Sequence, residues 1–580
     1  MLLKMAISFI SGSTFKFLMN KRLHLILPAI LFFNSLTFSQ DAISDGRLLD
    51  IIKQKGQAEV TVVYSGRKEA DYLSRNLSVA SVKDKRIHII LSRRTAEWFI
   101  AQHYDYEIIE RDDSKGIDNS SDINEAMEWE TYPTYIQYDS IMQKFADDYP
   151  SLCDLDTIGT SINGKLILAL KISDNAGNDE DEPAVFYSST MHGDETGGYI
   201  LMLRLADYLL KNYSLSTRVK DLADNLEIWI NPLANPDGTY GSGNIMTSPT
   251  RFNANGKDLN RNFPDPEDPE IIPEKETIDM ISFMRRHKFV LSANFHSGAE
   301  VVNYPWDRWF RLHADDDWFY NVSRRYADTV HEHSVSGYMT YLDNGITNGY
   351  DWYRINGGRQ DFMVYELHGR EVTIELDDNF VTPAAQLNSL WEYNWRSLLG
   401  YLENSLYGIH GSVLDDQTSA PVPARIFITG HDKDSSHVYS DTLTGSFVRL
   451  IAPGIWNLLI TAGGYYGVQL SNVAVTEDQP AYIQVEMHSI DESDAMVPVL
   501  HPNPATTYIL ADLPEWQSGR INIRIFNSTG IKIADYYSYT LEGIPVKIDV
   551  SGLAGGVYTV LFTSTTSKVT DKGRFVVLRR

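Results

Sequence analysis

Two segments of this 580-residue chain carry side chains of the types that ligate metal ions. His192 and Glu195 stand three positions apart directly after one apolar stretch, and His296 lies at the end of another. Two imidazoles and one carboxylate leave one of the four positions around a zinc ion open, as in catalytic zinc sites. His192 and Glu195 alone are a weak signal, because a surface His and Glu at a helix start have the same spacing. His296 as a third ligand favours an open metal site, which neighbouring motifs must support.

The elements around these residues predict one large α/β domain between about residues 129 and 407. Apolar, strand-like runs alternate with helical patterns at 184–188, 196–211, 226–230, 289–295 and 385–404. Buried strands that alternate with helices indicate a mostly parallel or mixed sheet covered by helices. The three candidate ligands would then lie at the carboxyl ends of strands, where open α/β sheets hold their sites.

Further polar motifs follow in the same region, at residues 251–265, 352–361 and 373–376. With these motifs in this order, residues 130–405 resemble the zinc carboxypeptidase family. The resemblance is strongest to the regulatory-type group, which includes carboxypeptidases N, E and D. It implies an α/β fold with a mixed, mostly parallel eight-stranded sheet flanked by helices. It also implies one zinc ion (Zn2+) per catalytic domain as the cofactor.

The resemblance implies a role for each residue that matches the family's metal site. His192, Glu195 and His296 correspond to the zinc ligands. Asp258 corresponds to the carboxylate that orients His192, and such outer partners fix the tautomer and the ring direction of a ligating histidine.

The same resemblance assigns the residues that handle the substrate. Asn260 and Arg261 match the pair that holds the substrate's terminal carboxylate, a task that suits a planar guanidinium. Arg251 matches the arginine that stabilises the oxyanion of the scissile carbonyl. Tyr353 matches the mobile tyrosine that closes over the bound C-terminus. Glu375 matches the general base, 22 positions after that tyrosine.

Substrate preference depends on two further positions. Asp307 stands eleven residues after His296, and Gln360 stands seven after Tyr353. In the regulatory-type group such residues lie in the side-chain pocket, and the aspartate selects C-terminal Lys or Arg. A buried carboxylate needs a cationic partner because burying it unpaired is costly. The alternative is that Asp307 is a loop residue without a role in the pocket.

Composition narrows the classes of partner. The formal net charge is −26, which repels phosphate backbones and argues against nucleic-acid binding. A high net charge also keeps a protein soluble, so the charge alone does not identify a partner. Cys153 is the single cysteine, so an intramolecular disulfide is excluded and the fold depends on packing and metal.

The N-terminal region carries the layout of an export signal over residues 1–40. Lys21 and Arg22 precede an apolar stretch at 23–33 and then small and polar residues, and Met19 is an alternative start. The apolar stretch is too short to span a membrane, and no later stretch is long enough. Residues 57–111 read as a small α/β unit, with strands at 58–64, 87–91 and 106–109 and helices at 67–76 and 94–103. An acidic, flexible linker follows at 112–122. Together, residues 41–125 form either a pro-segment or a permanent accessory domain.

Two all-β units are expected after the α/β domain. Residues 408–488 carry an opening strand at 409–413 and a turn at 453–454, and with these they resemble the transthyretin-like β-sandwich of regulatory-type carboxypeptidases, with a structural role. Residues 497–580 carry a Pro-Asn-Pro motif at 502–504, a turn at 526–530 and a Gly-rich motif at 553–558. With these motifs they resemble the C-terminal sorting domain of type IX secretion, which implies contact with the secretion machinery. Its alternative is another adhesive β-sandwich. A sorting domain implies a protein that is secreted or held on the outer surface of a Gram-negative bacterium.

The sequence therefore predicts an exported zinc metallocarboxypeptidase that acts on the C-termini of peptides or proteins. Its catalytic domain spans residues 126–407. Two alternatives remain open. One is a non-catalytic member of the fold that binds peptides or cell-wall material, and it requires the loss of a ligand or base that this chain retains. The other is a zinc amidohydrolase of cell-wall peptides, which needs the same metal centre.

Overall fold

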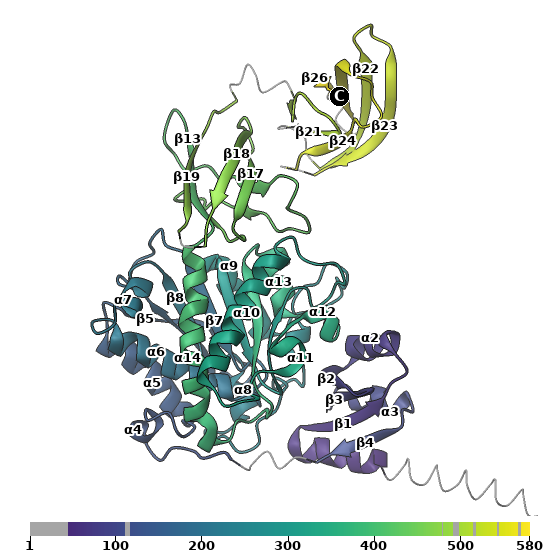
Figure 1. Cartoon of the computed structure of the whole chain (residues 1–580). Coiled ribbons are helices and arrows are strands. Elements are labelled where there is room, and N and C mark those ends of the chain that lie inside the picture. Colours follow the sequence, from purple (N-terminus) through teal and green to yellow (C-terminus); the bar gives the residue numbers. More distant parts are fainter. Residues whose placement is uncertain are drawn as a thin grey trace, which may run out of the picture. The chain divides into compact units, whose positions relative to one another are not determined.

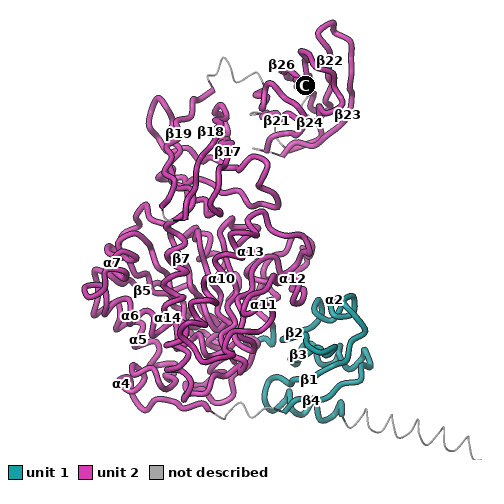
Figure 2. The backbone as a smooth tube through the Cα atoms, viewed as in Figure 1, with its two compact units in different colours: residues 1–112, 255–257 teal, residues 113–254, 258–580 magenta. Residues whose placement is uncertain are grey.

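The computed structural model describes residues 44–110, 116–477, 479–490, 498–513, 518–541, 544–565 and 570–579. The chain divides into two compact units, residues 1–112 with 255–257 and residues 113–254 with 258–580 (Figure 2). The expected export signal over residues 1–40 lies outside the described residues. Among the described residues, no helix has both the length and the apolar character needed to cross a membrane.

The first unit is built on a four-stranded sheet. The strand order is β2 (Ser78–Lys83), β3 (Arg86–Ser92), β1 (Gln57–Val63) and β4 (Tyr106–Ile109), and every pairing is antiparallel. A helix over residues 44–55, α2 (Arg67–Asn76) and α3 (Ala96–Ala101) accompany the sheet. The sequence predicts β1, β3, β4 and the two labelled helices, and it misses β2.

The second unit contains an eight-stranded sheet with the order β11-β10-β12-β9-β7-β8-β6-β5. Its strands β5, β7 and β8 are labelled in Figure 1. The four central strands β12, β9, β7 and β8 run parallel, and the antiparallel pairs are β10–β12, β8–β6 and β6–β5. This confirms the predicted mixed, mostly parallel sheet. The strand bounds are β5 Cys153–Thr160, β6 Leu166–Ile172, β7 Ala184–Ser189, β8 Glu227–Asn231, β9 Leu291–His296, β10 Ala299–Tyr304, β11 Ile346–Asn348 and β12 Arg370–Asp377.

Helices cover both faces of this sheet because side chains of its strands alternate between two apolar cores. One core joins the sheet to α5 (Tyr135–Asp148), α6 (Gly197–Asn212), α10 (Asp316–His333) and α14 (Leu387–Glu403). The other joins it to α9 (Lys275–His287) and α13 (Arg359–Glu366). The shorter elements are α4 Ile123–Ala126, α7 Thr217–Ala223, α8 Pro236–Tyr240, α11 Tyr341–Asn344, α12 Gly349–Trp352, η1 Leu259–Arg261, η2 Ala384–Gln386 and η3 Asn404–Leu406.

The predicted flexible linker is wrong for its second half. In residues 116–122, Ser120 donates its backbone N–H to Tyr132 O at 2.9 Å, and Asn119 Nδ2 donates to Met246 O at 2.9 Å. Asp122 caps the N-terminus of α4 by accepting from Asn124 N. The Asp, Ser and Asn side chains that suggested a linker serve here as turn and cap residues.

Two seven-stranded β units follow. The first packs a sheet of order β16-β13-β19 against one of order β15-β14-β17-β18, and β13 pairs with β19 in parallel. The second contains sheets of order β20-β21-β24 and β23-β22-β25-β26, all antiparallel, around one apolar core. The bounds are β13 Ile409–Asp415, β14 Arg425–Ile428, β15 Val438–Tyr439, β16 Ser446–Arg449, β17 Gly454–Thr461, β18 Val468–Val475, β19 Ala481–Met487, β20 Val499–His501, β21 Tyr508–Asp512, β22 Gly519–Asn527, β23 Lys532–Thr540, β24 Val546–Asp549, β25 Gly556–Ser564 and β26 Thr570–Val577.

Candidate active site

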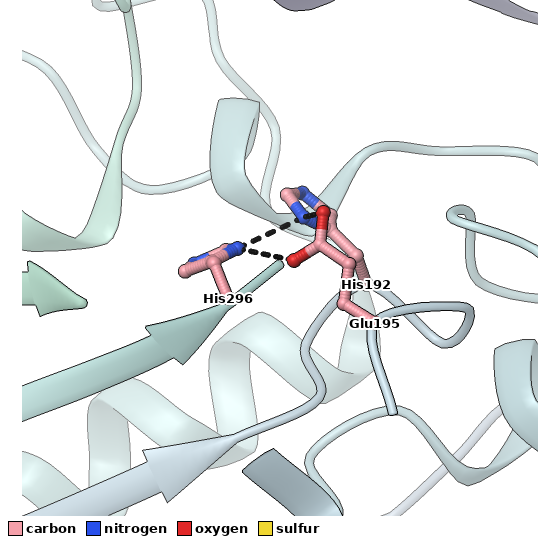
Figure 3. Close-up of side chains that lie close together, drawn as sticks. All are labelled: His192, Glu195 and His296. Carbon is pink, nitrogen blue, oxygen red and sulfur yellow. Dashed lines mark hydrogen bonds and ion pairs between the residues drawn. The ribbon is translucent and has the colours of Figure 1, made fainter. Parts of the chain in front are cut away.

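The three candidate metal ligands meet at the carboxyl ends of two neighbouring parallel strands. His192 and Glu195 lie between β7 and α6, and His296 is the last residue of β9. The two oxygens of Glu195 lie 2.8 Å from His192 Nδ1 and 2.7 Å from His296 Nδ1 (Figure 3). The two Nδ1 atoms are 3.0 Å apart, and all three side chains are buried. The structure therefore brings together residues that are up to 104 positions apart in the sequence.

This donor set fits a zinc ion. His₂Glu is a ligand set of catalytic zinc, and bond lengths of about 2.0–2.1 Å in tetrahedral geometry separate the ligand atoms by about 3.4 Å. The observed separations of 2.7–3.0 Å are slightly shorter, so a small outward movement of the side chains accommodates the ion. Burial lowers the pKa of His296 to about 4, which keeps its imidazole in the neutral, metal-binding form. Burial alone raises the pKa of Glu195, but the two imidazoles outweigh it and hold this carboxyl ionised.

Asp258 fixes the orientation of His192. Its Oδ1 accepts a hydrogen bond from His192 Nε2 at 2.9 Å, which leaves Nδ1 of the same ring for the metal. Its Oδ2 accepts from Arg251 Nε at 3.0 Å. Arg251 Nη1 reaches Glu195 Oε1 at 2.8 Å, so this guanidinium lies directly beside the metal ligands.

Asn260 and Arg261 lie in η1, immediately after Asp258. The backbone N–H of Asn260 donates to Asp258 Oδ1 at 2.9 Å, and Arg261 Nη1 donates to the carbonyl of Asn260 at 2.9 Å. Asp258 therefore connects the histidine ligand and the pair predicted to bind the substrate carboxylate.

Glu375 lies opposite His296 in the register of the parallel strands β12 and β9. Its Oε2 is buried without a hydrogen-bond partner among the described residues. Burial and the carboxylate of Glu195 raise the pKa of Glu375, while Arg251 and Arg261 act in the opposite direction. An unpaired carboxylate oxygen beside the metal ligands is able to accept a proton from water in this site.

Tyr353 follows α12 and belongs to the same site. Burial raises its pKa to about 12, and the charges of Arg261, Glu375, Arg251 and Asp307 all act on its hydroxyl. Since electrostatic influence between side chains falls with distance, these groups surround one region.

Asp307 is a buried carboxylate held by amides. Its Oδ1 accepts from Asn303 Nδ2 at 2.8 Å and from Gln360 Nε2 at 3.0 Å. Burial raises its pKa to about 6. A Cβ atom at Gly349 would lie 1.9 Å from Asp307 Oδ1, so only glycine leaves room for the carboxylate here. The structure thus places the two predicted pocket residues in direct contact.

Sequence reasoning missed four polar residues around this site. They are Asn294, Arg359, Asp361 and Glu371. Asn294 and Glu371 precede His296 and Glu375 by two and four positions, so they lie on the same face of their strands. This alternation of polar residues within apolar strands was the signal available in the sequence. His313 lies outside this set and is buried against Trp306 and Phe319.

Comparisons with known proteins agree with this geometry. Residues 138–397 match the family described as zinc carboxypeptidase, and residues 499–577 match the secretion system C-terminal sorting domain. The chain is 34% identical over 362 residues to human carboxypeptidase D, covering 58% of this chain but 25% of that protein. It is 32% identical to the catalytic chain of human carboxypeptidase N, covering 57% of this chain and 80% of that one. It is also 32% identical to mouse carboxypeptidase M, covering 56% and 77%.

Proposed function

Because this chain belongs to the zinc carboxypeptidase family, we propose that it hydrolyses the C-terminal peptide bond of peptides or proteins and prefers C-terminal Lys or Arg. The convergence of His192, Glu195 and His296 beside Glu375 carries this proposal. If His192 and Glu195 were only surface residues at a helix start, they would not meet His296 in a buried position. A protein that only binds peptides would not need the unpaired Oε2 of Glu375 beside the metal ligands.

Catalysis needs an electrophile and a base, and the site supplies both. A zinc ion held by the three ligands supplies a Lewis acid for a carbonyl oxygen and for water. The Oε2 of Glu375 has no partner among the described residues, so it is available to accept a proton. Glu375 takes this proton from the attacking water and delivers it to the leaving amine. Arg251 donates its N–H groups to the negative charge that develops on the carbonyl oxygen.

Exopeptidase action follows from the guanidinium of Arg261. With Asn260 it binds the terminal carboxylate of the substrate, and two parallel hydrogen bonds from a guanidinium suit a carboxylate. An internal peptide bond offers no carboxylate at this distance from the metal. Tyr353 closes over the bound C-terminus.

The preference for basic residues rests on Asp307. Its carboxylate is buried and its partners Asn303 and Gln360 are neutral amides. A Lys or Arg side chain of the substrate would provide the missing positive charge. A neutral side chain would leave the buried carboxylate with amide partners and no cation in direct contact, which is costly.

Cleavage of matched peptides tests the proposal. Peptides that end in Arg, Lys, Leu or Glu are incubated with the purified full chain, with and without a metal chelator. We expect release of single residues, fastest for Arg and Lys, and loss of cleavage with the chelator. An Arg peptide with an amidated C-terminus should resist cleavage. Chelator-resistant cleavage contradicts the metal mechanism, and preference for Leu contradicts the role of Asp307.

The flanking segments support an exported enzyme. The sorting domain at residues 499–577 implies secretion or display at the cell surface, and the protein is secreted or held on the outer surface of a Gram-negative bacterium. Residues 1–40 act as the export signal, and residues 408–488 form a structural β-sandwich. The unit at residues 41–125 is an inhibitory pro-segment if limited proteolysis raises activity, and an accessory domain if activity is unchanged.

A further inference from the structure

A C-terminal Arg or Lys would meet the proposed site at two ends. Its carboxylate would reach Arg261 and its cationic group would reach Asp307, so the distance between these two residues limits which side chains fit. Arg261 lies in η1 and Asp307 follows β10, and the chain between them contains α9, β9 and β10. Contacts between the two segments, rather than local sequence, must therefore set that distance.

Asp265, four positions after Arg261, makes such contacts. Its Oδ2 accepts an N–H of the Arg308 guanidinium and also the backbone N–H of Gly357, the latter at 3.0 Å. Its Oδ1 accepts the backbone N–H of Glu267 at 2.9 Å, within the turn that carries the carboxylate. This buried side chain therefore binds two segments that lie 43 and 92 positions further along the chain.

Arg308, the neighbour of Asp307, makes the contacts in return. Its Nη1 donates to Asp265, and its Nε and Nη2 donate to Glu267 Oε2 at 3.2 and 3.1 Å. Trp309 Nε1 donates to the other oxygen of Glu267 at 2.6 Å. Each of these contacts pairs an N–H donor with a carboxylate oxygen, so the whole set forms without any change in protonation.

Backbone hydrogen bonds join the same three segments beside the ion pair. Phe263 donates its N–H to Gly357 O at 3.0 Å, and Ile355 donates its N–H to Asp307 O at 3.2 Å. Gly357 has a φ of +65°, and a Cβ atom there would lie 3.0 Å from the carbonyl of Arg261. The segments are therefore packed backbone to backbone, and a shift of one moves the residues that the others carry.

Stability alone does not explain a buried ion pair at this place. Replacing such a pair by apolar side chains of similar size is often neutral or stabilising. Apolar side chains are at hand, since Trp309, Phe362 and Tyr365 line the same small cavity as Asp265 and Arg308. Apolar contacts have no preferred direction, whereas a guanidinium places each acceptor along an N–H bond. The ion pair therefore supplies a defined distance between segments, which apolar packing does not.

We propose that Asp265 and Arg308 form a positioning pair that sets the distance from Arg261 to Asp307, and thereby the length of the C-terminal side chain that the site accepts. Both residues act through the segments they join, and the substrate contacts remain those of Arg261 and Asp307. This inference rests on the proposed function and extends it from the charge of the preferred residue to its length.

Peptides that differ only in the length of the C-terminal cationic side chain test the proposal. Arg, Lys and ornithine carry their charge at successively shorter distances from the terminal carboxylate. The unmodified chain should favour the best of the three over the worst by about tenfold or more in kcat/KM, the usual worth of a methylene in a fitted pocket. Asp265→Asn and Arg308→Met should each reduce this ratio to about threefold or less, mainly by raising the KM of the best peptide.

The ratio separates positioning from loss of folded protein. Both kcat/KM values come from one preparation, so the concentration of active enzyme cancels. Arg308→Lys should give an intermediate ratio, because an ammonium keeps the charge but lacks the fork that reaches two carboxylates. The double variant Asp265→Asn with Arg308→Met should lower the ratio little further than either single change, because both break the same contact.

A matched control uses another buried ion pair of the same domain. Lys171 Nζ lies 2.5 Å from Glu227 Oε1, and Glu227 is the first residue of the parallel strand β8, whereas the metal ligands lie at the carboxyl ends of the parallel strands. Lys171→Met combined with Glu227→Gln therefore removes a buried charge pair at the opposite edge of the sheet. It should alter the melting temperature and leave the ratio of kcat/KM values unchanged.

Binding of two small probes to the zinc-loaded full chain tests the distance without requiring cleavage. L-arginine carries both a carboxylate and a guanidinium, whereas agmatine carries the guanidinium without the carboxylate. Engaging both groups at once requires that their separation match that of the two binding residues. In calorimetric titrations, Asp265→Asn should weaken the binding of L-arginine by about tenfold and that of agmatine by less than about twofold.

Folded variants that keep the ratio of the unmodified chain overturn the proposal. Equal weakening of both probes also overturns it, because only the pocket at Asp307 would then be disturbed. If Arg308→Met does not fold, Asp265→Asn and Arg308→Lys still give the ratio. An unmodified chain that cleaves all three peptides equally well overturns the inference and leaves the proposed hydrolysis intact. One that binds L-arginine more tightly than agmatine but cleaves no peptide contradicts the proposed function, and the probe titrations still decide the role of the pair.

Discussion

Two buried charge networks start from adjacent residues of β12 and serve different regions. Glu371 binds the buried Arg359 at 3.0 Å and starts a column of polar residues on β9 and β12 that ends at His296 and Glu375. Arg370 instead binds Asp315 at 2.7 Å and the carbonyl of Ser436 at 2.8 Å. Both networks combine a buried arginine with a buried carboxylate, so the chemistry is the same. The difference lies in what each network holds.

The second network joins the α/β domain to the first β-sandwich. Asp315 also accepts from Arg449 Nη2 at 2.9 Å and lies 2.8 Å from His431 Nε2. Arg449 in turn donates to Asp432 Oδ1 at 2.6 Å. Arg449, His431 and Asp432 belong to the β-sandwich, so these charges hold one domain to the other. Adjacent residues of a strand point to opposite faces, and this alternation separates the metal site from the domain junction.

The comparison predicts that changes in the polar column act on activity while changes at the domain junction act on stability. The largest effect is expected at the top of the column. Glu375→Gln removes the proton acceptor and should lower kcat by about 10²–10⁴-fold with little change in KM. Steady-state kinetics on an Arg-ending peptide measure both.

The same variant should not lose stability. Burial raises the pKa of Glu375 in the metal-free protein, so the carboxyl favours the protonated form when folded. Ionisation of such a group costs folding stability as pH rises through its unfolded value towards its folded value. The uncharged amide removes this cost, so metal-free Glu375→Gln should melt at the same or a higher temperature at neutral pH. A lower melting temperature would contradict this account.

The second effect is expected at the domain junction. Asp315→Asn leaves two buried arginines without their shared carboxylate and should cost about 3–5 kcal/mol of stability. Denaturant unfolding measures the loss, and the kcat of the folded variant should stay unchanged. Asp317→Asn, at an exposed position in the first turn of α10, the helix that Asp315 precedes, should cost less than about 1 kcal/mol. A folded Asp315→Asn variant with strongly reduced kcat would break the separation between the two networks.

The sequence predicts the elements and the metal ligands but neither of the two networks. Strands β7, β8 and β9 and helices α6 and α14 were predicted near their observed positions, because their apolar residues repeat with the period of the element. The metal ligands were predicted because His192, Glu195 and His296 lie in short local motifs. Neither network was predicted, since Arg359 and Asp315 meet their partners only after the strand order of the sheet and the docking of another domain are set. Outside an alternating strand, a charged residue in a sequence gives no sign that it will be buried.

The predicted linker shows that local sequence also fails to predict which polar segments are ordered. Residues 116–122 have a composition that predicts flexibility, yet Asn119 and Ser120 bond to Met246 and Tyr132. Local composition describes what a segment can do alone, whereas partners 12 and 127 positions away decide what it does in the fold.

The smallest predicted effect is on the pH dependence of substrate binding at Asp307. Asp307 needs its charge to bind a cationic side chain, and burial raises its pKa to about 6 in the free protein. The charge of Arg261 lowers this pKa and that of Glu371 raises it, and the carboxylate of Asp307 in turn raises the pKa of the nearby Asp361. As pH falls through about 6, Asp307 takes up a proton and loses the charge that the substrate requires.

The KM for an Arg-ending peptide should therefore rise as pH falls below about 6, by at most about tenfold per pH unit. The KM for a Leu-ending peptide has no such requirement and should vary less over the same range. Asp307→Asn should remove the difference between the two pH profiles, because an amide does not titrate there. Parallel profiles for both peptides in the unmodified protein would mean that the charge of Asp307 does not select the substrate. Selection would then have to come from the shape of the pocket around Gly349 and Gln360.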